Sequence, residues 1–326
     1  YLSDYYHTRF PEAKIRLVNS GVSGDNAGGA QKRIADDVTY YSPTWVLIHF
    51  GMNDVGRGDH VRNQSPAQKA HAAECRACFE RNLVVLSDKV RDAVPGVREI
   101  YATPTPYDDT AVITNKGWKG SNWEGCNKAL AGLGEYVEKT AEARGVPSVN
   151  WHKPLNDFLQ KRRDAGDMQF MFTGLDRVHP KPAGHAIMAW TFLKAQGVPA
   201  TVSDIVVDAE KAKAVKSENA TVTEVKSDKD GLSCTVLAKS LPFPAPAEAR
   251  DILDEFDVEN TLNREVFAVT GLAQGEYALL IDGEEVARAD AAQMVAQRRF
   301  ADLERHAVPG RAVRADVAAR IGAHPR

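Results

Sequence analysis

Short, continuous apolar runs alternate with longer stretches of helical periodicity through the first two hundred residues. The apolar runs predict four buried strands, at 15–19, 44–50, 97–103 and 147–150. Uninterrupted apolar character bounded by turn residues is typical of strands covered on both faces. Between the second and third runs, apolar positions spaced by three and four predict a helix through Cys75, Phe79, Leu83 and Leu86. Strands that alternate with helices predict an α/β fold, a three-layer α/β/α domain around a parallel sheet.

The pattern changes after about residue 200. Two pairs of apolar runs each flank a turn-rich link, which is typical of β-hairpins: 220–225 with 232–238, and 265–270 with 277–281. Asp282-Gly283 then turns the chain again. We therefore predict two domains, residues 1–200 and a smaller, strand-rich region of residues 201–326. We expect a structural role for the second region, with sugar binding as the alternative.

The strongest chemical signal is Asp176-Arg177-Val178-His179-Pro180, shortly before a predicted helix. Histidine is the side chain best suited to move a proton near neutral pH. A carboxylate three residues earlier can accept a hydrogen bond from its Nδ1–H, fix the tautomer and stabilise the imidazolium. Alone, such a pair is more often two polar surface residues, so the interpretation depends on other parts of the chain.

Two upstream turns supply that support. Val18-Asn19-Ser20-Gly21-Val22-Ser23-Gly24-Asp25 ends one apolar run, and His49-Phe50-Gly51-Met52-Asn53-Asp54 ends another. With Asp176-x-x-His179 they resemble the second, third and fifth sequence blocks of the SGNH (GDSL-type) hydrolases, over roughly residues 1–200. The resemblance implies a catalytic pair of Asp176 and His179, and oxyanion donors at Gly24 and Asn53. It also implies a flavodoxin-like sheet of order 2-1-3-4-5, and no metal or other cofactor.

The family's first block, a Gly-Asp-Ser segment with the nucleophilic serine, is not in this chain. Ser23 precedes the oxyanion glycine and Ser3-Asp4 reverses the family's order, so we expect neither to replace it. Three interpretations stay open: a fragment, a truncated gene, or a non-catalytic relative. We favour the first two, because the absent strand would lie between the strands at 15–19 and 44–50. Without it, their buried backbone groups would lack partners.

The activity that the resemblance implies is ester hydrolysis by a serine esterase. Our first hypothesis is removal of acetyl or other small acyl groups from carbohydrate. The alternatives are a general short-chain esterase, lipase or thioesterase, and a binding protein that kept the fold. Trp118 and Trp123 could stack on sugar rings at the lip of the site or pin their own loop, and we favour pinning. Family analogy favours a periplasmic or secreted location.

Composition and cysteine content add exclusions. The 326 residues carry a net charge of −3, with 43% hydrophobic and 26% charged residues, which gives no reason to expect a nucleic-acid partner. No run reaches the roughly 18 to 20 apolar residues of a membrane span. Cys75-Arg76-Ala77-Cys78 has a redox or zinc-like spacing, but no second CxxC or His pair completes a zinc site. We expect Cys75 to be a buried small side chain, and a disulfide from this helix to Cys126 stays open.

Overall fold

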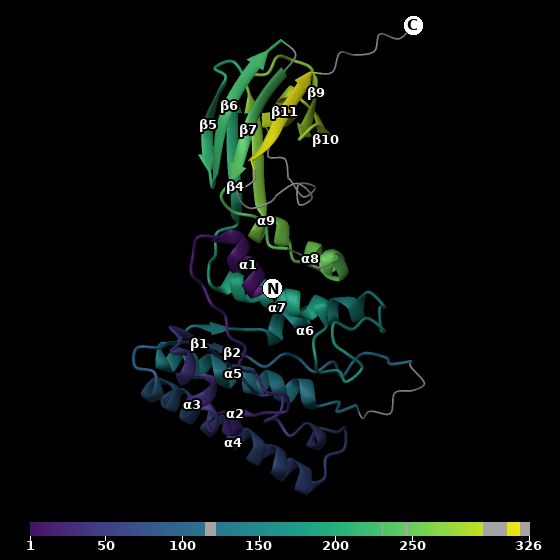
Figure 1. Ribbon diagram of the computed structural model, residues 1–326. Coiled ribbons are helices and arrows are strands. Elements are labelled where there is room, and N and C mark those ends of the chain that lie inside the picture. The colour runs from purple at the N-terminus through teal and green to yellow at the C-terminus, as the bar shows by residue number, and fades with distance from the viewer. Residues whose placement is uncertain (115–121, 230, 245–246, 296–311, 320–326) are drawn as a thin grey trace. The chain divides into compact units, whose positions relative to one another are not determined.

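The computed structural model describes residues 1–114, 122–229, 231–244, 247–295 and 312–319. The chain forms two compact units (Figure 1), which we call the α/β unit, Val18–Gln196, and the strand-rich unit, Tyr1–Leu17 with Gly197–Arg326. The sequence pattern predicts a boundary near residue 200, with the first residues in the hydrolase domain. In the structure, residues 1–17 group with the strand-rich unit instead.

A parallel sheet of order β1-β2-β3 forms the centre of the α/β unit. Its strands are β1 (Trp45–His49), β2 (Arg98–Ala102) and β3 (Ser148–Val149). Leu47 pairs with Ile100, and Tyr101 pairs with Ser148, so all three strands run in the same direction. The predicted α/β fold is confirmed, and three of the four predicted strands are present.

Helices cover both faces of this sheet. α4 (Pro66–Ala93) connects β1 to β2 and α5 (Cys126–Arg144) connects β2 to β3, while α6 (His152–Asp164) and α7 (Pro182–Ala195) lie on the opposite side (Figure 1). The shorter elements are α2 (Ala27–Ala30), α3 (Ile34–Asp37), η1 (Thr39–Tyr41) and η2 (Arg57–Asp59). One core joins α4 and α5 to the sheet through fully buried side chains, among them Phe79, Leu83, Leu130, Val137, Ile48 and Tyr101. In the part of the chain that the structure describes, no helix is both long enough and apolar enough to cross a membrane.

The long helix α4 has a well-defined start. The Ser65 hydroxyl accepts a hydrogen bond from the Gln68 N–H at 3.2 Å, and the Gln68 side chain accepts one from the Ser65 N–H at 3.0 Å. This reciprocal capping box satisfies two N–H groups that would otherwise lack helical partners. Pro66 follows at the first helical position, where its fixed φ is compatible and its missing N–H costs nothing.

The predicted strand at 15–19 is wrong. These residues form no regular element, and Leu17 and Val18 are 49% and 41% exposed. Among the described strands, β1 lies at the edge of its sheet, and its Trp45 and Leu47 are 43% and 37% exposed. A strand needs a neighbour to satisfy its backbone N–H and C=O groups. Residues 15–19 belong to none of the sheets of the described residues, so an apolar run alone did not make them a strand.

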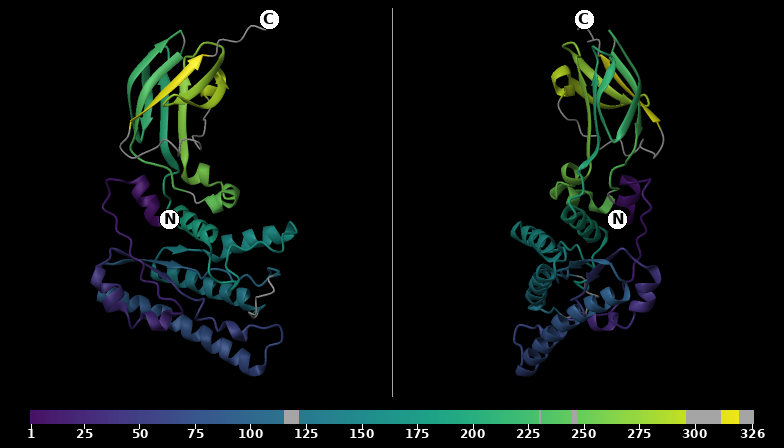
Figure 2. Two further views of the ribbon diagram at one scale, coloured as in Figure 1. Left: turned by 45° about the vertical axis from the view of Figure 1, so that its right-hand side comes forward. Right: turned by 90° about the vertical axis from the view of Figure 1, so that its left-hand side faces the viewer.

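The strand-rich unit contains two sheets whose strands can be followed in Figure 2. A three-stranded sheet of order β5-β4-β8 contains β4 (Thr201–Asp208), β5 (Lys213–Glu218) and β8 (Arg264–Thr270). A five-stranded sheet of order β10-β9-β11-β7-β6 contains β6 (Ala220–Asp228), β7 (Gly231–Ala238), β9 (Glu276–Ile281), β10 (Glu284–Asp290) and β11 (Ala312–Ala319). Both sheets contribute to one core, with Val207, Val269, Leu279 and Ile281 among its buried members. The helical segments are α1 (Leu2–Arg9), η3 (Ala247–Ala249), α8 (Arg250–Glu255), α9 (Val258–Leu262) and α10 (Ala291–Val295).

Two hairpin predictions for this unit had different outcomes. β6 and β7 pair antiparallel as predicted, and β9 and β10 pair through a turn at Asp282 and Gly283 with φ of 50° and 87°. Positive φ at both positions matches the tight turns that suit twisted hairpins. The predicted hairpin between 265–270 and 277–281 is wrong, because β8 pairs parallel with β4 and β9 belongs to the other sheet. Strand patterning marks a strand without choosing its partner.

The N-terminal helix α1 is held in the strand-rich unit by buried contacts. The Arg9 guanidinium donates hydrogen bonds to the backbone oxygens of Thr201 at 2.9 Å and Leu262 at 2.5 Å. Tyr5 is fully buried, and its ring lies 6.5 Å from that of Phe243. Contacts across roughly two hundred residues or more therefore explain why residues 1–17 leave the domain to which the sequence assigned them.

Candidate active site

The turn that follows β1 carries the predicted oxyanion residue Asn53. Gly51 opens this turn with φ of +127°, and a Cβ there would lie 3.0 Å from Cβ of Pro104, so the position requires glycine. The Asp54 carboxylate accepts hydrogen bonds from the Gly51 N–H and the Ala27 N–H, each at 3.0 Å. Burial raises the pKa of Asp54, and these backbone hydrogen bonds oppose that rise. Asp54 therefore ties the Asn53 turn to the first turn of α2.

Asn53 and Gly24, predicted from separate motifs, lie beside each other. The Asn53 side-chain amide donates a hydrogen bond to the Asp25 backbone oxygen at 2.9 Å. Gly24 precedes Asp25, has φ of +77°, and has no atom within 4 Å of the place where a Cβ would stand. An Asn side-chain amide has two N–H donors, so one stays available after the bond to Asp25. The two turns together place an amide and an open backbone position at one exposed site.

Arg33 holds the loop that carries Gly24, a contact that the sequence analysis missed. Its guanidinium donates to Asp25 Oδ2 from Nε at 2.9 Å and from Nη2 at 2.6 Å, and to the Ser20 backbone oxygen at 3.2 Å. Gly29 completes the packing, because a Cβ there would stand 1.9 Å from Asp25 Oδ1. No spacing rule marks an Arg eight residues after an Asp, so only the folded loop identifies this pair.

Asp176 and His179 form the predicted hydrogen-bonded pair. His179 Nδ1 lies 2.6 Å from Asp176 Oδ2, and the other carboxylate oxygen accepts from the N–H groups of Val178 at 3.0 Å and His179 at 3.1 Å. Burial alone would raise the pKa of Asp176, but the hydrogen bonds from the His179 ring and the two N–H groups hold that pKa below its usual value. The His179 side chain is 75% exposed, so its ring is accessible from solvent.

The loop that carries Asp176 and His179 is held by hydrogen bonds between Arg177 and Asp108. Arg177, between the two residues, adopts a left-handed φ of 65°. Its guanidinium donates to the Asp108 backbone oxygen at 2.6 Å, and its own backbone oxygen accepts from the Asp108 N–H at 3.1 Å. Val178 is buried in the same core as Ala27 and Val55, which lie next to the Gly24 and Asn53 turns. The pair and the two upstream turns therefore share one hydrophobic anchor.

Asp108 is held in place by a buried ion pair with Arg163. The Asp108 carboxylate accepts bonds from Arg163 Nη2 at 3.1 and 3.0 Å, and both side chains are almost fully buried. The Thr110 hydroxyl and the Ala111 N–H also donate to Asp108, each at 3.1 Å. A role for Asp108 or Arg163 could not be predicted from the sequence, because a charge pair 55 positions apart leaves no local pattern.

Of the two tryptophans proposed for the lip of the site, only Trp123 can be placed. Its ring lies 5.7 Å from the Tyr107 ring and beneath the Arg57 guanidinium at 5.5 Å, and it packs against the core of the α/β unit. These contacts are those of a residue that pins its loop, as the sequence analysis favoured. Trp118 lies outside the described residues.

The hydroxyls of Ser20 and Ser3 contact groups other than the residues assigned to ester hydrolysis. Ser20 donates to the Asp37 backbone oxygen at 2.7 Å, and Ser3 lies on α1, 3.3 Å from His7 Nδ1. The four cysteines are free thiols, so the disulfide that the sequence left possible between α4 and Cys126 is not formed. Cys126 is buried, which raises its pKa to about 12. Cys75 is half-buried rather than buried, which corrects its assignment as a plain core side chain.

His49, expected to be a core histidine, gives a pH prediction. Its ring contacts the Trp151 ring at a centroid distance of 4.7 Å, and burial lowers its pKa from 6.5 to about 4. Between those values the unfolded chain binds more protons than the folded one, so this histidine lowers stability as the pH falls from about 6.5 to 4. Between pH 7 and pH 4.5 the effect is roughly 2–3 kcal/mol. We expect His49→Phe to remove it, as measured by urea unfolding at pH 7 and pH 4.5.

Asp109 also titrates in this pH range, so the unfolding free energies of the parent and of His49→Phe must be compared at each pH. Burial raises its pKa from 3.8 to about 6, so the folded state binds the extra proton and stability from this group rises as the pH falls. That contribution is the same in the parent and in His49→Phe, and it cancels in their difference. An equal loss of stability on acidification in both proteins would contradict the role given to His49.

Comparison with known proteins shows which family this chain belongs to. Residues 1–187 match the family model described as GDSL-like Lipase/Acylhydrolase family. An acetylxylan esterase from Geobacillus stearothermophilus is 28% identical over 188 residues, which are 58% of this chain and 75% of that protein. A solved structure, BT4096, described as a gut microbial diltiazem-metabolizing enzyme, matches with a TM-score of 0.76 at 29% identity. That match covers 92% of this chain and 68% of the other.

Proposed function

The chain belongs to the GDSL-like lipase/acylhydrolase family, a family of ester-bond hydrolases, and we propose that its substrate is a carbohydrate carrying acetyl or other small acyl groups. The observation that carries the chemistry is the 2.6 Å contact between His179 Nδ1 and Asp176 Oδ2 within the matched residues. The similarity to an acetylxylan esterase supports the carbohydrate substrate.

In the proposed reaction a serine hydroxyl attacks the ester carbonyl. His179 Nε2 takes the hydroxyl proton and later returns it to the leaving alkoxide, while Asp176 keeps the Nδ1 proton in place and stabilises the imidazolium. The second N–H of the Asn53 amide and the Gly24 backbone N–H donate to the oxyanion of the tetrahedral intermediate. Each such donor is typically worth about 2.7–4 kcal/mol of transition-state stabilisation. The chain contains no Gly-Asp-Ser segment, so the nucleophile is assigned to none of its residues.

The substrate class is tested by comparing the rates at which two series of esters are hydrolysed by the native polypeptide, meaning the protein as its source produces it. Acetylated xylo-oligosaccharides should be hydrolysed with a higher kcat/KM than p-nitrophenyl esters, and within the latter series acetate should exceed the longer acyl chains. Faster hydrolysis of the long-chain esters would instead identify a lipase or thioesterase. In such a comparison kcat/KM measures differential transition-state binding, so it reports on substrate choice directly.

Asn53→Ala is expected to lower kcat by roughly 10²- to 10³-fold with little change in KM, because the amide–oxyanion bond strengthens only in the transition state. The measurement is steady-state hydrolysis of p-nitrophenyl acetate by the native polypeptide. Asn19→Ala is the matched control, since Asn19 Oδ1 only accepts from the Gly21 N–H in a neighbouring exposed turn. A variant at position 53 with unchanged kcat would remove Asn53 from the oxyanion site.

A second candidate function is a binding protein that retains the fold without turnover, favoured by the absence of a Gly-Asp-Ser segment from the 326 residues. Treatment with a serine-directed phosphonate, followed by mass spectrometry, separates the two candidates. We expect no label at Ser3, Ser20 or Ser23. A polypeptide that takes up no label anywhere but binds acetylated oligosaccharide would be the binding protein, and a labelled Ser23 would overturn the mapping of the motifs.

A further inference from the structure

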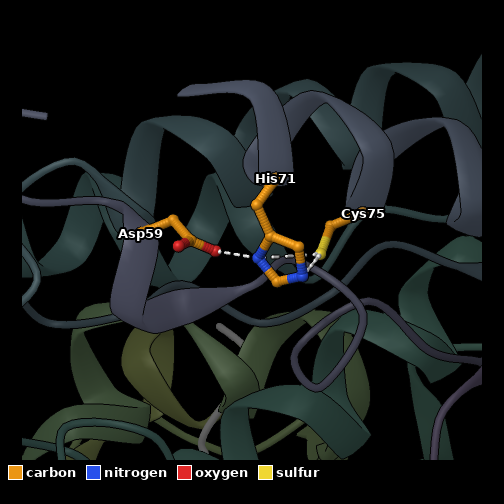
Figure 3. Close-up of side chains that lie close together, drawn as sticks. All are labelled: Asp59, His71 and Cys75. Carbon is orange, nitrogen blue, oxygen red and sulfur yellow. Dashed lines mark hydrogen bonds and ion pairs between the residues drawn. The ribbon is translucent and has the colours of Figure 1, made fainter. Parts of the chain in front are cut away.

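Asp59, His71 and Cys75 lie close together and are not among the residues assigned to ester hydrolysis (Figure 3). Asp59 ends η2, while His71 and Cys75 lie four residues apart on α4 and therefore on one face of that helix. His71 Nδ1 lies 2.7 Å from Asp59 Oδ2, and Cys75 Sγ lies 3.8 Å from His71 Nε2 and 4.0 Å from Nδ1. One donor atom from each side chain can be chosen so that all three lie within 4.8 Å of one another.

The local backbone closes around these donors. Gly56 has φ of +67°, and a Cβ there would stand 2.9 Å from both Asp59 Oδ2 and Cys75 Sγ. Only glycine lets the chain pass this closely between the carboxylate and the thiol. η2 is further fixed to its own loop because the Asp59 N–H donates to the Gly56 backbone oxygen at 2.9 Å, and the Gln64 amide donates to the Asp59 backbone oxygen at 2.7 Å.

The chemistry of the three donors selects a class of ligand. Carboxylate, imidazole and thiolate together match Zn²⁺ and neighbouring first-row transition metals, whereas Mg²⁺ and Ca²⁺ require oxygen ligands. In a tetrahedral site with metal–ligand bonds of about 2.0–2.3 Å, donor atoms stand about 3.3–3.8 Å apart. The sulfur–nitrogen distances already lie close to that range. The Asp59–His71 contact must open slightly, which the 61% exposed His71 side chain permits.

We propose that Asp59, His71 and Cys75 form a binding site for a transition-metal ion, with Zn²⁺ as the reference ligand and water completing its coordination. The CxxC spacing did not identify this site, because the partners of Cys75 are His71 one turn earlier and a carboxylate from another segment. Cys78 is not among the donors, since its sulfur lies 3.2 Å from Arg81 Nη2. On binding, the Cys75 thiol gives its proton to solvent and the sulfur forms the metal bond. By joining η2 to α4, the ion would stabilise the loop that begins at the Asn53 turn.

The proposal is tested on the native polypeptide after removal of metals with a chelator. Calorimetric titration with Zn²⁺ should give one bound ion per chain, and titration with Co²⁺ should give the near-ultraviolet absorption band of a cobalt–thiolate bond. Cys75→Ala should abolish that band and weaken Zn²⁺ binding by about tenfold or more, and His71→Ala should weaken Zn²⁺ binding similarly. Zn²⁺ should also slow alkylation of Cys75, read by mass spectrometry.

Cys78→Ala is the matched control, because it removes a thiol one turn away and should leave both affinity and absorption band unchanged. His71 is exposed, so His71→Ala tests the site even if a change at Cys75 perturbs folding, and circular dichroism checks each variant. Zn²⁺ affinity in the His71 and Cys75 variants equal to that of the unmodified protein, or loss of the band only in Cys78→Ala, would overturn the proposal. None of these readouts depends on ester hydrolysis, so the outcome is independent of the proposed function.

Discussion

His179→Ala is expected to lower kcat for ester hydrolysis by the native polypeptide by about 10⁴- to 10⁶-fold, which is effective loss of turnover. The imidazole accepts the nucleophile's proton and returns it to the leaving group, so its removal takes away both proton transfers. Asp176→Asn should keep the fold but impair kcat strongly, because an amide at this position no longer favours the tautomer with the proton on Nδ1. Initial rates on p-nitrophenyl acetate, with circular dichroism to verify folding, measure both effects.

His185→Ala provides the matched control for this prediction. His185 is another exposed histidine, six residues later on α7, and it makes no hydrogen bond to Asp176, whose carboxylate is occupied by the His179 ring and two backbone N–H groups. Its place on the predicted helix suggested a packed side chain, and its exposure in the structure corrects that prediction. We expect its replacement to leave most of the turnover. If His185→Ala is the inactive variant and His179→Ala is active, the imidazole has been assigned wrongly.

The second large effect concerns stability. Arg163→Ala is expected to lower the free energy of unfolding by about 3–5 kcal/mol, because it leaves the Asp108 carboxylate buried without its counter-charge. Both side chains are at most 5% exposed, so solvent cannot replace the lost partner. Urea or thermal unfolding measures the change, with the slope of the urea transition verifying that cooperativity is retained.

Arg62→Ala is the matched control for the ion pair. Arg62 Nε also donates to a carboxylate oxygen, of Glu124 at 2.8 Å, but its side chain is 79% exposed. Exposed pairs of this kind contribute about 0–1 kcal/mol. Losses of equal size in the two variants would show that burial of the Asp108 pair does not decide its contribution. Because the Asp108 backbone holds Arg177, Arg163→Ala should also lower kcat more than Arg62→Ala does.

Some of the site could be predicted from sequence because each motif is a local arrangement of backbone and side chain. Asp176 reaches His179 within one turn, so their spacing alone brings the two side chains together. Gly24 and Asn53 follow apolar runs, and their residue types match what an oxyanion requires. The hydrogen bond from Asn53 to the Asp25 backbone oxygen has no local sequence pattern, because the two residues are 28 positions apart.

Other features could not be predicted because they depend on which distant segment lies alongside. Arg163 approaches Asp108 only after α6 has packed against the loop that follows β2. Asp59 reaches His71 and Cys75 only because η2 folds back on α4. The apolar run at 15–19 is the reverse case, because a strand-like local pattern did not produce a strand in any sheet of the described residues.

The sequence by itself determined the alternation of strands and helices in the α/β unit, the parallel sheet and the local hydrogen-bonded pair of Asp176 and His179. These follow from periodicity and short spacing, which act within a few residues. Only the tertiary structure decided that residues 1–17 join the strand-rich unit, that β8 and β9 belong to different sheets, and that three donors meet near Cys75. Each of those outcomes is a contact between distant segments, where packing and hydrogen-bond satisfaction rather than local pattern select the partner.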